Sequence, residues 1–186
     1  FKICRYLLFA AMLPAFNLLA THNRSGEIVY EKIGPLTVRA KVITFTKTSS
    51  ANGDRDTLTI CWGDGVCEQI VRANGPGSPP QGEELANDTK YNIYVGVHTY
   101  AAEGIYVISM TDQNRNAGIM NVNPPSSDNV PFHLQAMINF LPEAAGSTGS
   151  PVLLAPPIDI AFVGQPYIHA ANAFSASGDS IAYQLI

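Results

Sequence analysis

Apolar and polar residues alternate with a period of two through most of the chain from Glu27 onward, which is typical of β-strands that bury one face. The alternation is most regular in residues 130–140, where every second position is apolar or aromatic. Residues 104–110, GIYVISM, are apolar on both faces and predict a central strand. About seven short strands separated by turn residues predict an all-β fold with the architecture of a β-sandwich.

One predicted strand changes phase along its length. In residues 36–45, LTVRAKVITF, the apolar residues occupy even positions as far as Val42 and odd positions at Ile43 and Phe45. An extra residue in one strand of a pair shifts the alternation in this way. We therefore expect a β-bulge within this strand.

Aromatic residues occupy both faces of another predicted strand. Residues 91–100 place Tyr91 on one face and Tyr94, His98 and Tyr100 on the other. Tyrosines at such positions usually pack across strands, and we favour this interpretation. An exposed tyrosine can also stack on a sugar ring, so glycan binding is an alternative.

The beginning of the chain has the character of a targeting segment. Residues 1–20 combine the basic Lys2 and Arg5 with a short apolar core, which predicts a signal peptide. A membrane anchor fits less well because Pro14 and Asn17 interrupt the apolar run. We expect the mature chain to be secreted or held at the cell surface, and to have no membrane span.

Two further stretches divide the remaining chain. Residues 72–90 are polar and rich in Gly and Pro, which predicts a long surface loop. Residues 142–151 have the composition of a linker between a first domain, residues 21–141, and a second strand series, residues 152–186. Because the second series stops inside an apparent strand, we expect it to be the start of an incomplete domain.

The overall composition narrows the classes of partner. The chain is 46% hydrophobic and 14% charged, which is typical of a folded globular protein. Its net charge is −4, and its eleven Lys and Arg residues are spread over the whole length. Nucleic-acid binding is disfavoured, because no basic cluster is present to displace the counterions of a phosphate backbone.

The sequence TICWGDGVCEQ, residues 59–69, contains the one Trp and two of the three Cys residues. Two cysteines with five residues between them lack the further ligands of a zinc site and the spacing of a redox motif. If the turn holds three residues, Cys61 and Cys67 lie opposite each other in a hairpin, and we predict a disulfide between them. Trp62 then points into the core.

Two separated motifs resemble a PKD domain, the immunoglobulin-like module of many exported and cell-surface proteins. The first is LTICWGDG and the second is HTYAAEGIYVISMTD. The long loop of residues 72–90 and the two cysteines are departures from the family pattern. The signature positions that match are Trp62, Gly63, Asp64, Gly65, His98, Tyr100, Gly104 and Tyr106, followed by Val107, Thr111 and Asp112.

The resemblance implies an immunoglobulin-like β-sandwich. The segment from Ser177 to Tyr183, SGDSIAY, resembles the opening half of a cadherin-like domain, in which an Asp usually stands at the first position. The whole arrangement is similar to the amino-terminal part of gliding-motility-associated surface proteins of Bacteroidetes. This resemblance implies that the partners are other domains of the same long chain, and surface glycans or proteins.

Calcium is the one cofactor that the sequence suggests, and only weakly. Asp112, Asn114 and Asn116 occupy alternate positions, as ligands do in a calcium loop. The following Gly comes one residue late and no closing Glu is present, so a solvated turn capped by these side chains is favoured. The same two interpretations apply to Asp54 and Asp56. We expect no cofactor.

Catalytic motifs are lacking. The four His residues are scattered, and the sequence contains neither HExxH nor GxSxG. Glu83 and Glu84 are interpreted as solvated loop charges. We therefore expect a non-catalytic structural or adhesion module of a larger surface protein. A carbohydrate-binding module attached to a secreted enzyme is the alternative, and a hydrolase whose catalytic residues lie elsewhere is the third possibility.

Overall fold

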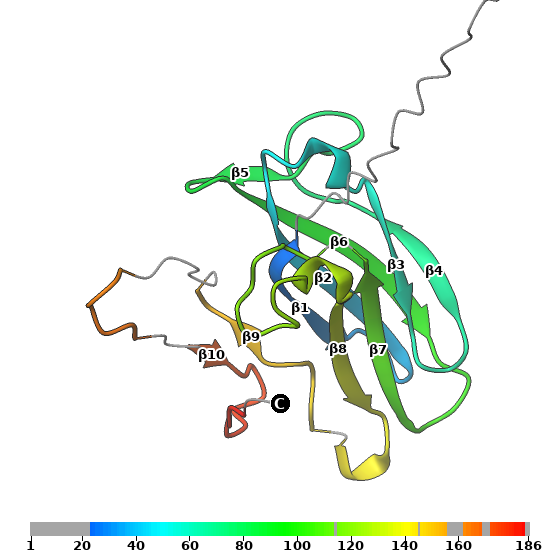
Figure 1. Cartoon of the computed structure of the whole chain (residues 1–186). Helices are drawn as coiled ribbons and strands as arrows, with labels where there is room; N and C mark the ends of the chain where they lie inside the picture. The colour runs from blue at the N-terminus through cyan, green and yellow to red at the C-terminus, as the bar shows by residue number, and fades with distance from the viewer. Residues whose placement is uncertain (1–22, 114, 145, 156–161, 169–171, 185–186) are drawn as a thin grey trace, which may run out of the picture.

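The computed structural model describes residues 23–113, 115–144, 146–155, 162–168 and 172–184 (Figure 1). The predicted signal peptide lies outside these residues. Short 3₁₀ turns η1 (Ala51–Gly53), η2 (Ser127–Asn129) and η3 (Pro142–Ala144) connect the strands of this part of the chain. The strands are β1 (Asn23–Lys32), β2 (Thr37–Lys47), β3 (Thr57–Cys61), β4 (Cys67–Val71), β5 (Glu83–Leu85), β6 (Thr89–Thr99), β7 (Ile105–Asp112), β8 (Phe132–Asn139), β9 (Val152–Leu153) and β10 (Ala173–Phe174).

Two four-stranded antiparallel sheets face each other, which confirms the predicted all-β sandwich (Figure 1). One sheet has the strand order β1-β2-β6-β5 and the other has the order β4-β3-β7-β8. The prediction of a central strand at residues 104–110 is also confirmed, because β7 lies between β3 and β8. Strands β9 and β10 form a separate two-stranded ribbon.

The core lies between the two sheets and follows the predicted alternation. Ile60 and Trp62 point inward from the β3 side, and Ile138 points inward from β8. Tyr94 and Tyr100 are also buried, so the interpretation of these tyrosines as packing residues is confirmed. The other fully buried apolar side chains include Val38, Ala40, Val42, Ile108 and Met110.

The prediction of a bulge in the second strand is wrong. Strand β2 pairs with β6 without a register shift from Thr37 to Lys47, and the shift occurs in β1 between Asn23 and Ser25. The inward face of β2 simply continues with polar residues after Val42, because Thr44 and Thr46 are buried. Ile43 and Phe45 therefore lie on the outer face, where they line a cleft together with residues 152–155.

Hydrogen bonds make this polar end of the core possible. The Asn92 side-chain amide on β6 donates to the hydroxyl of Thr46 over 3.0 Å and to that of Thr44 over 3.4 Å. Buried polar groups cost free energy unless they are paired in this way. The alternation of burial thus persists along β2 although the alternation of hydrophobicity does not.

The loop at residues 72–90 is mostly exposed, as predicted, but its ends are part of the fold. Glu83–Leu85 pair with β6 as the edge strand β5. The Arg72 side chain is fully buried, with its guanidinium 2.8 Å from Asp54 Oδ1 and over the ring of Tyr94. Lys90 Nζ donates to the second oxygen of Asp54 over 3.1 Å. The interpretation of Asp54 as a solvated turn residue or calcium ligand is replaced by this ion cluster.

The predicted linker contains a segment that lies along the free edge of β1. Thr148 O accepts a hydrogen bond from Lys32 N over 2.7 Å, and Ser150 N donates to Tyr30 O over 2.9 Å. Tyr30 N donates to the Ser150 hydroxyl over 2.9 Å, and Gly149 pairs with Glu31 as an isolated antiparallel bridge. We call residues 148–150 the strap. It extends the β1-β2-β6-β5 sheet at the edge that β1 would otherwise expose.

Candidate functional site

The signature residues Gly63, Asp64 and Gly65 form a three-residue turn between β3 and β4. Trp62 N donates to Val66 O over 2.9 Å and closes the turn. Gly63 and Gly65 have φ values of +87° and +94°, which other residues rarely adopt. The Asp64 carboxylate accepts a hydrogen bond from Val66 N over 3.1 Å, so the side chain stabilises the turn from within.

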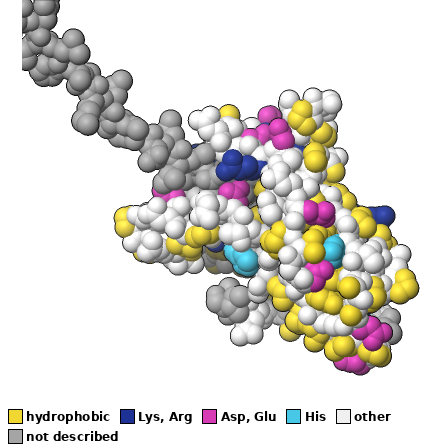
Figure 2. Space-filling view, turned by 90° about the vertical axis from the view of Figure 1, so that its right-hand side faces the viewer, with side chains coloured by type: hydrophobic (Ala, Val, Ile, Leu, Met, Phe, Trp, Pro, Cys, Tyr) yellow, Lys and Arg dark blue, Asp and Glu magenta, His cyan; other side chains and the backbone are white. Residues whose placement is uncertain are grey.

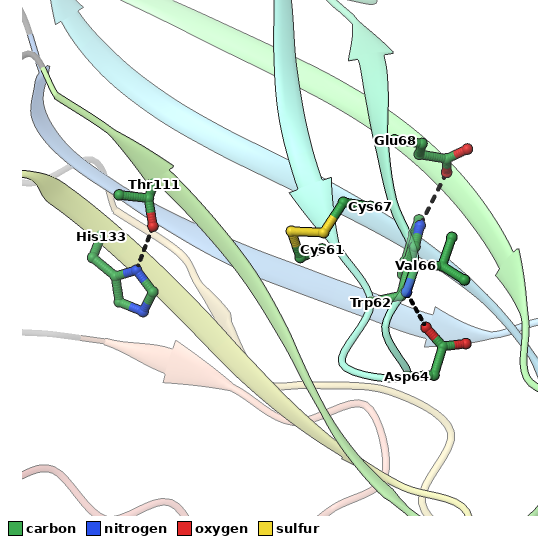
Figure 3. Close-up of a disulfide and its surroundings, with 8 residues drawn as sticks. All are labelled: Cys61, Trp62, Asp64, Val66, Cys67, Glu68, Thr111 and His133. Atoms are coloured by element: carbon green, nitrogen blue, oxygen red, sulfur yellow. Dashed lines mark hydrogen bonds between the residues drawn. A yellow bond between two sulfur atoms is a disulfide. The ribbon is translucent and has the colours of Figure 1, made fainter.

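The predicted disulfide is confirmed. Cys61 and Cys67 are register partners at the end of the hairpin, with their Cα atoms 4.0 Å apart and an S–S bond of 2.06 Å (Figure 3). The bond lies on the outer face of its sheet, because Trp62, the next residue, points the other way into the core. The two cysteines therefore cross-link adjacent strands directly beside the turn.

Trp62 is completely buried, and both its indole N–H group and its backbone carbonyl are hydrogen-bonded. Its indole Nε1 donates to Glu68 Oε1 over 3.1 Å, and its carbonyl oxygen accepts a hydrogen bond from the Tyr100 hydroxyl over 2.9 Å. The first bond joins the turn to β4, and the second joins it to the end of β6. A buried Trp needs such a partner for its N–H group, and Glu68 provides it.

His98 connects this turn to an aromatic stack. Its ring lies nearly parallel to that of Trp62 at a centroid distance of 5.0 Å, and it meets Tyr100 edge-on at 4.7 Å. Its Nε2 atom is 2.7 Å from Asp64 Oδ2. Desolvation alone would raise the pKa of Asp64, but the hydrogen bonds from His98 and Val66 N and the charge of His98 together hold it below its usual value.

The remaining signature residues complete the stack. Tyr106 lies face to face with Tyr100 at 4.0 Å, and its hydroxyl donates to Ala102 O over 2.9 Å. Gly104 O accepts a hydrogen bond from Phe140 N over 2.8 Å, which joins the β6–β7 connection to the end of β8. Burial raises the pKa of the Tyr100 hydroxyl above its usual range. The eight signature positions thus gather at one end of the sandwich.

The described contacts of this cluster join the two sheets at one end of the sandwich. Its one His–carboxylate pair, His98 with Asp64, has no serine, threonine or cysteine thiol among the contacts described above, and the nearby cysteines are bonded to each other. A hydrogen-bonded turn, a disulfide and stacked rings stabilise the packing of two sheets. Within the described ranges, no group of three or more His, Cys, Asp and Glu side chains is arranged to hold a metal ion.

Two of the three calcium candidates lie in the described part of the chain, and both have other partners there. The Asp112 carboxylate lies 3.7 Å from Arg55 Nε, so a guanidinium already faces it. Asn116 uses its backbone, which donates to Asn23 O over 3.2 Å and accepts from the Ser127 hydroxyl over 2.7 Å. Asn114 lies outside the described residues.

A cleft that the sequence pattern does not reveal lies on the outer face of the β1-β2-β6-β5 sheet. Its volume is about 440 Å³. Tyr91 lies in its wall, whereas Tyr94 and Tyr100, the other two tyrosines considered for sugar stacking, are in the core. The shift of apolar residues to odd positions at Ile43 and Phe45 was the one feature of the sequence that could have indicated this cleft. The described lining residues are Ser25, Gly26, Glu27, Ile43, Phe45, Glu83, Leu85, Tyr91, Val152, Leu153, Leu154 and Ala155.

Comparison of the chain with models of protein families, with curated proteins and with solved structures finds no match in any of the three. In the described part of the chain, no helix combines the length and the apolar character required to cross a membrane.

Proposed function

We propose that this chain is a non-catalytic, exported structural module of the immunoglobulin-like PKD type, which spaces and presents other domains of a long surface protein. The strand orders β1-β2-β6-β5 and β4-β3-β7-β8 support the assignment. They correspond to the ABED and CFG sheets of an immunoglobulin domain with one added strand, β4, beside the strand that occupies the C position.

A second feature supports the immunoglobulin-like assignment. Tyr106 lies near the start of β7, the strand in the F position, and its hydroxyl bonds to the backbone four residues upstream, at Ala102. This is the arrangement of a tyrosine corner in immunoglobulin-like domains. The disulfide between Cys61 and Cys67 supports export, because such bonds persist in oxidising compartments.

The strap is the observation that carries the proposed spacing role. Three backbone and side-chain hydrogen bonds hold Thr148 and Ser150 against β1, so the chain leaves the sandwich in a fixed direction. Leu153 N also donates to Glu27 Oε2 over 3.2 Å, which continues the attachment into β9. A linker bound along a sheet edge transmits force and orientation, whereas a free linker of the same composition acts as a flexible coil.

The surface offers places for contact with neighbouring domains. Val66, Val71, Val107 and Met137 are exposed on the side of the β4-β3-β7-β8 sheet. Figure 2, which views the molecule from the right-hand side of Figure 1, shows apolar side chains gathered towards the lower right of that face. Exposed apolar groups of this kind support contacts with other domains of the same chain or with surface proteins. The association with gliding bacteria is proposed from the resemblance of the sequence alone.

Backbone ¹⁵N relaxation tests the spacing role. If the strap holds, residues 162–168 and 172–184 tumble with the same correlation time as the sandwich. Ser150→Pro removes the N–H group that donates to Tyr30 O and also the hydroxyl that accepts from Tyr30 N. We expect this variant to release the following residues, and Ser150→Ala, which keeps the N–H group, to release them less. Independent tumbling in the unaltered protein would contradict the proposal.

A further inference from the structure

The cleft described above has a floor built by cross-strand neighbours. Ser25, Phe45, Tyr91 and Glu83 are successive register partners across β1, β2, β6 and β5. The rings of Phe45 and Tyr91 are in contact, with centroids 5.3 Å apart. The centre of the row is therefore aromatic, and its two ends are polar.

Acidic groups stand on both sides of this aromatic floor. Glu83 is on β5 at one end of the row, and Glu27 is on β1 beside the other end, opposite Ile43. Three strand spacings of about 4.8 Å separate the backbones of β1 and β5, so the carboxylates flank the two rings. Among the described lining residues, Glu27 and Glu83 are the charged ones, and neither Lys, Arg nor His is present.

The other wall of the cleft is apolar and comes from the segment after the strap. Val152, Leu153 and Leu154 line it, and Leu153 N donates to Glu27 Oε2. Burial raises the pKa of Glu27, with the hydrogen bond from Leu153 acting against it. Burial raises the pKa of the Tyr91 hydroxyl, and the negative charges of Glu83 and Glu27 raise it further.

We propose that this cleft binds a small organic cation, an ammonium group carried on an apolar or aromatic body. The volume of about 440 Å³ is in the range of small-molecule sites. The apolar body would pack on Phe45, Tyr91 and Leu153, and the ammonium group would be attracted by Glu27, by Glu83 and by the aromatic faces. The cleft shares Glu27 and Leu153 with the attachment that follows the strap, and none of the signature residues lines it.

Three ligands of matched shape test the proposal: 2-phenylethylammonium, 2-phenylethanol and 3-phenylpropanoate. Each is titrated into the ¹⁵N-labelled protein, and amide shifts are followed. We expect saturable shifts with the ammonium at residues 43–45, 83–91 and 152–154, weaker shifts with the alcohol, and none with the carboxylate. Equal binding of the alcohol and the ammonium would overturn the proposal, as would binding of none of the three.

Charge-removing variants test the assigned carboxylates. We expect Glu27→Gln and Glu83→Gln each to weaken ammonium binding about threefold, and the double variant to weaken it about tenfold. Glu84→Gln is the matched control, because Glu84 is the next residue on β5 and is not in the cleft lining. A control that weakens binding as much as Glu83→Gln would overturn the assignment.

Two further titrations exclude other occupants. A neutral monosaccharide that produces saturable shifts at the same residues, where the ammonium does not, would overturn the proposal in favour of carbohydrate binding. A capped peptide containing Lys between apolar residues that binds when the free amine does not would overturn it in favour of a protein partner. The dispersion of the amide spectrum shows in each variant that the sandwich is folded.

Discussion

His98 Nε2 lies 2.7 Å from Asp64 Oδ2, so a residue at the end of β6 fixes the turn that joins β3 to β4 in the opposite sheet. The His98 ring simultaneously stacks on Trp62, which carries the turn's closing hydrogen bond. The pair therefore connects the two sheets through a polar contact at the margin of the core. Its carboxylate has a pKa below the ordinary value, which makes its contribution dependent on pH.

The contribution of Asp64 to stability should disappear in acid. Because its pKa is lower in the folded protein than in the unfolded chain, its stabilising effect is complete above the unfolded value of about 3.9 and is lost as the pH falls through the lower folded value. Asp64→Asn should cost ~1 kcal/mol of unfolding free energy near neutral pH, and the difference from the unaltered protein should shrink below about pH 4.

Urea denaturation at a series of pH values measures this difference. Comparing variant with unaltered protein at each pH isolates Asp64 from other carboxylates with lowered pKa values, such as Asp54 and Asp88. Glu103→Gln, which alters an exposed carboxylate, serves as the control and should give a small difference. A constant difference between Asp64→Asn and the unaltered protein from neutral pH to pH 2 would contradict the prediction.

The disulfide between Cys61 and Cys67 should contribute modestly to stability. Its sequence separation is six, so it removes little entropy from the unfolded chain, and the expected contribution is about 2 kcal/mol. A Cys61→Ser/Cys67→Ser double variant should unfold at lower urea concentration than the oxidised protein by that amount. Dithiothreitol should destabilise the unaltered protein and leave the double variant unaffected. Alkylation of both cysteines in the protein purified without reductant would show that the bond is absent.

Two glycines of the turn form a matched pair. Both have positive φ, but a Cβ atom at Gly63 would lie 2.6 Å from Val107 N, whereas a Cβ at Gly65 would meet nothing within 4 Å. Gly65→Ala should therefore cost only the backbone strain, about 1 kcal/mol. Gly63→Ala should cost more, because β7 must also move. Thermal or urea denaturation of the two variants compares them directly, and an equal loss would refute the steric argument.

Two arginines test the effect of burial on an ion pair. Arg72 and Arg39 each have a nitrogen 2.8 Å from a carboxylate oxygen, but the Arg72 side chain is fully buried and the Arg39 side chain is exposed. Arg72→Ala should cost about 3 kcal/mol, since Asp54 loses a buried partner. Arg39→Ala should cost less than about 1 kcal/mol. Denaturation in low and high salt provides the check, because salt should matter more for the Arg39 pair.

The period-two pattern was sufficient to predict the sandwich, because alternation records which side chains face a core between two sheets. It was insufficient at Ile43 and Phe45, where a bulge was expected. At these positions the hydrophobic pattern does not show that Asn92 donates hydrogen bonds to Thr44 and Thr46 on the inner face. A polar network formed by residues about 46 and 48 positions apart leaves no local periodic signal.

The hairpin of Cys61 and Cys67 was predictable because all its determinants are local: two glycines, an Asp and two cysteines at opposite register positions. The strap, the Arg72–Asp54 pair and the cleft were not, because each depends on which distant segments meet. Composition determined that residues 142–151 lack a strand pattern of their own. Backbone N–H and C=O groups are the same whatever the sequence, so the sequence does not show which segment pairs with the free edge of β1. Only the tertiary structure decided that residues 148–150 do so.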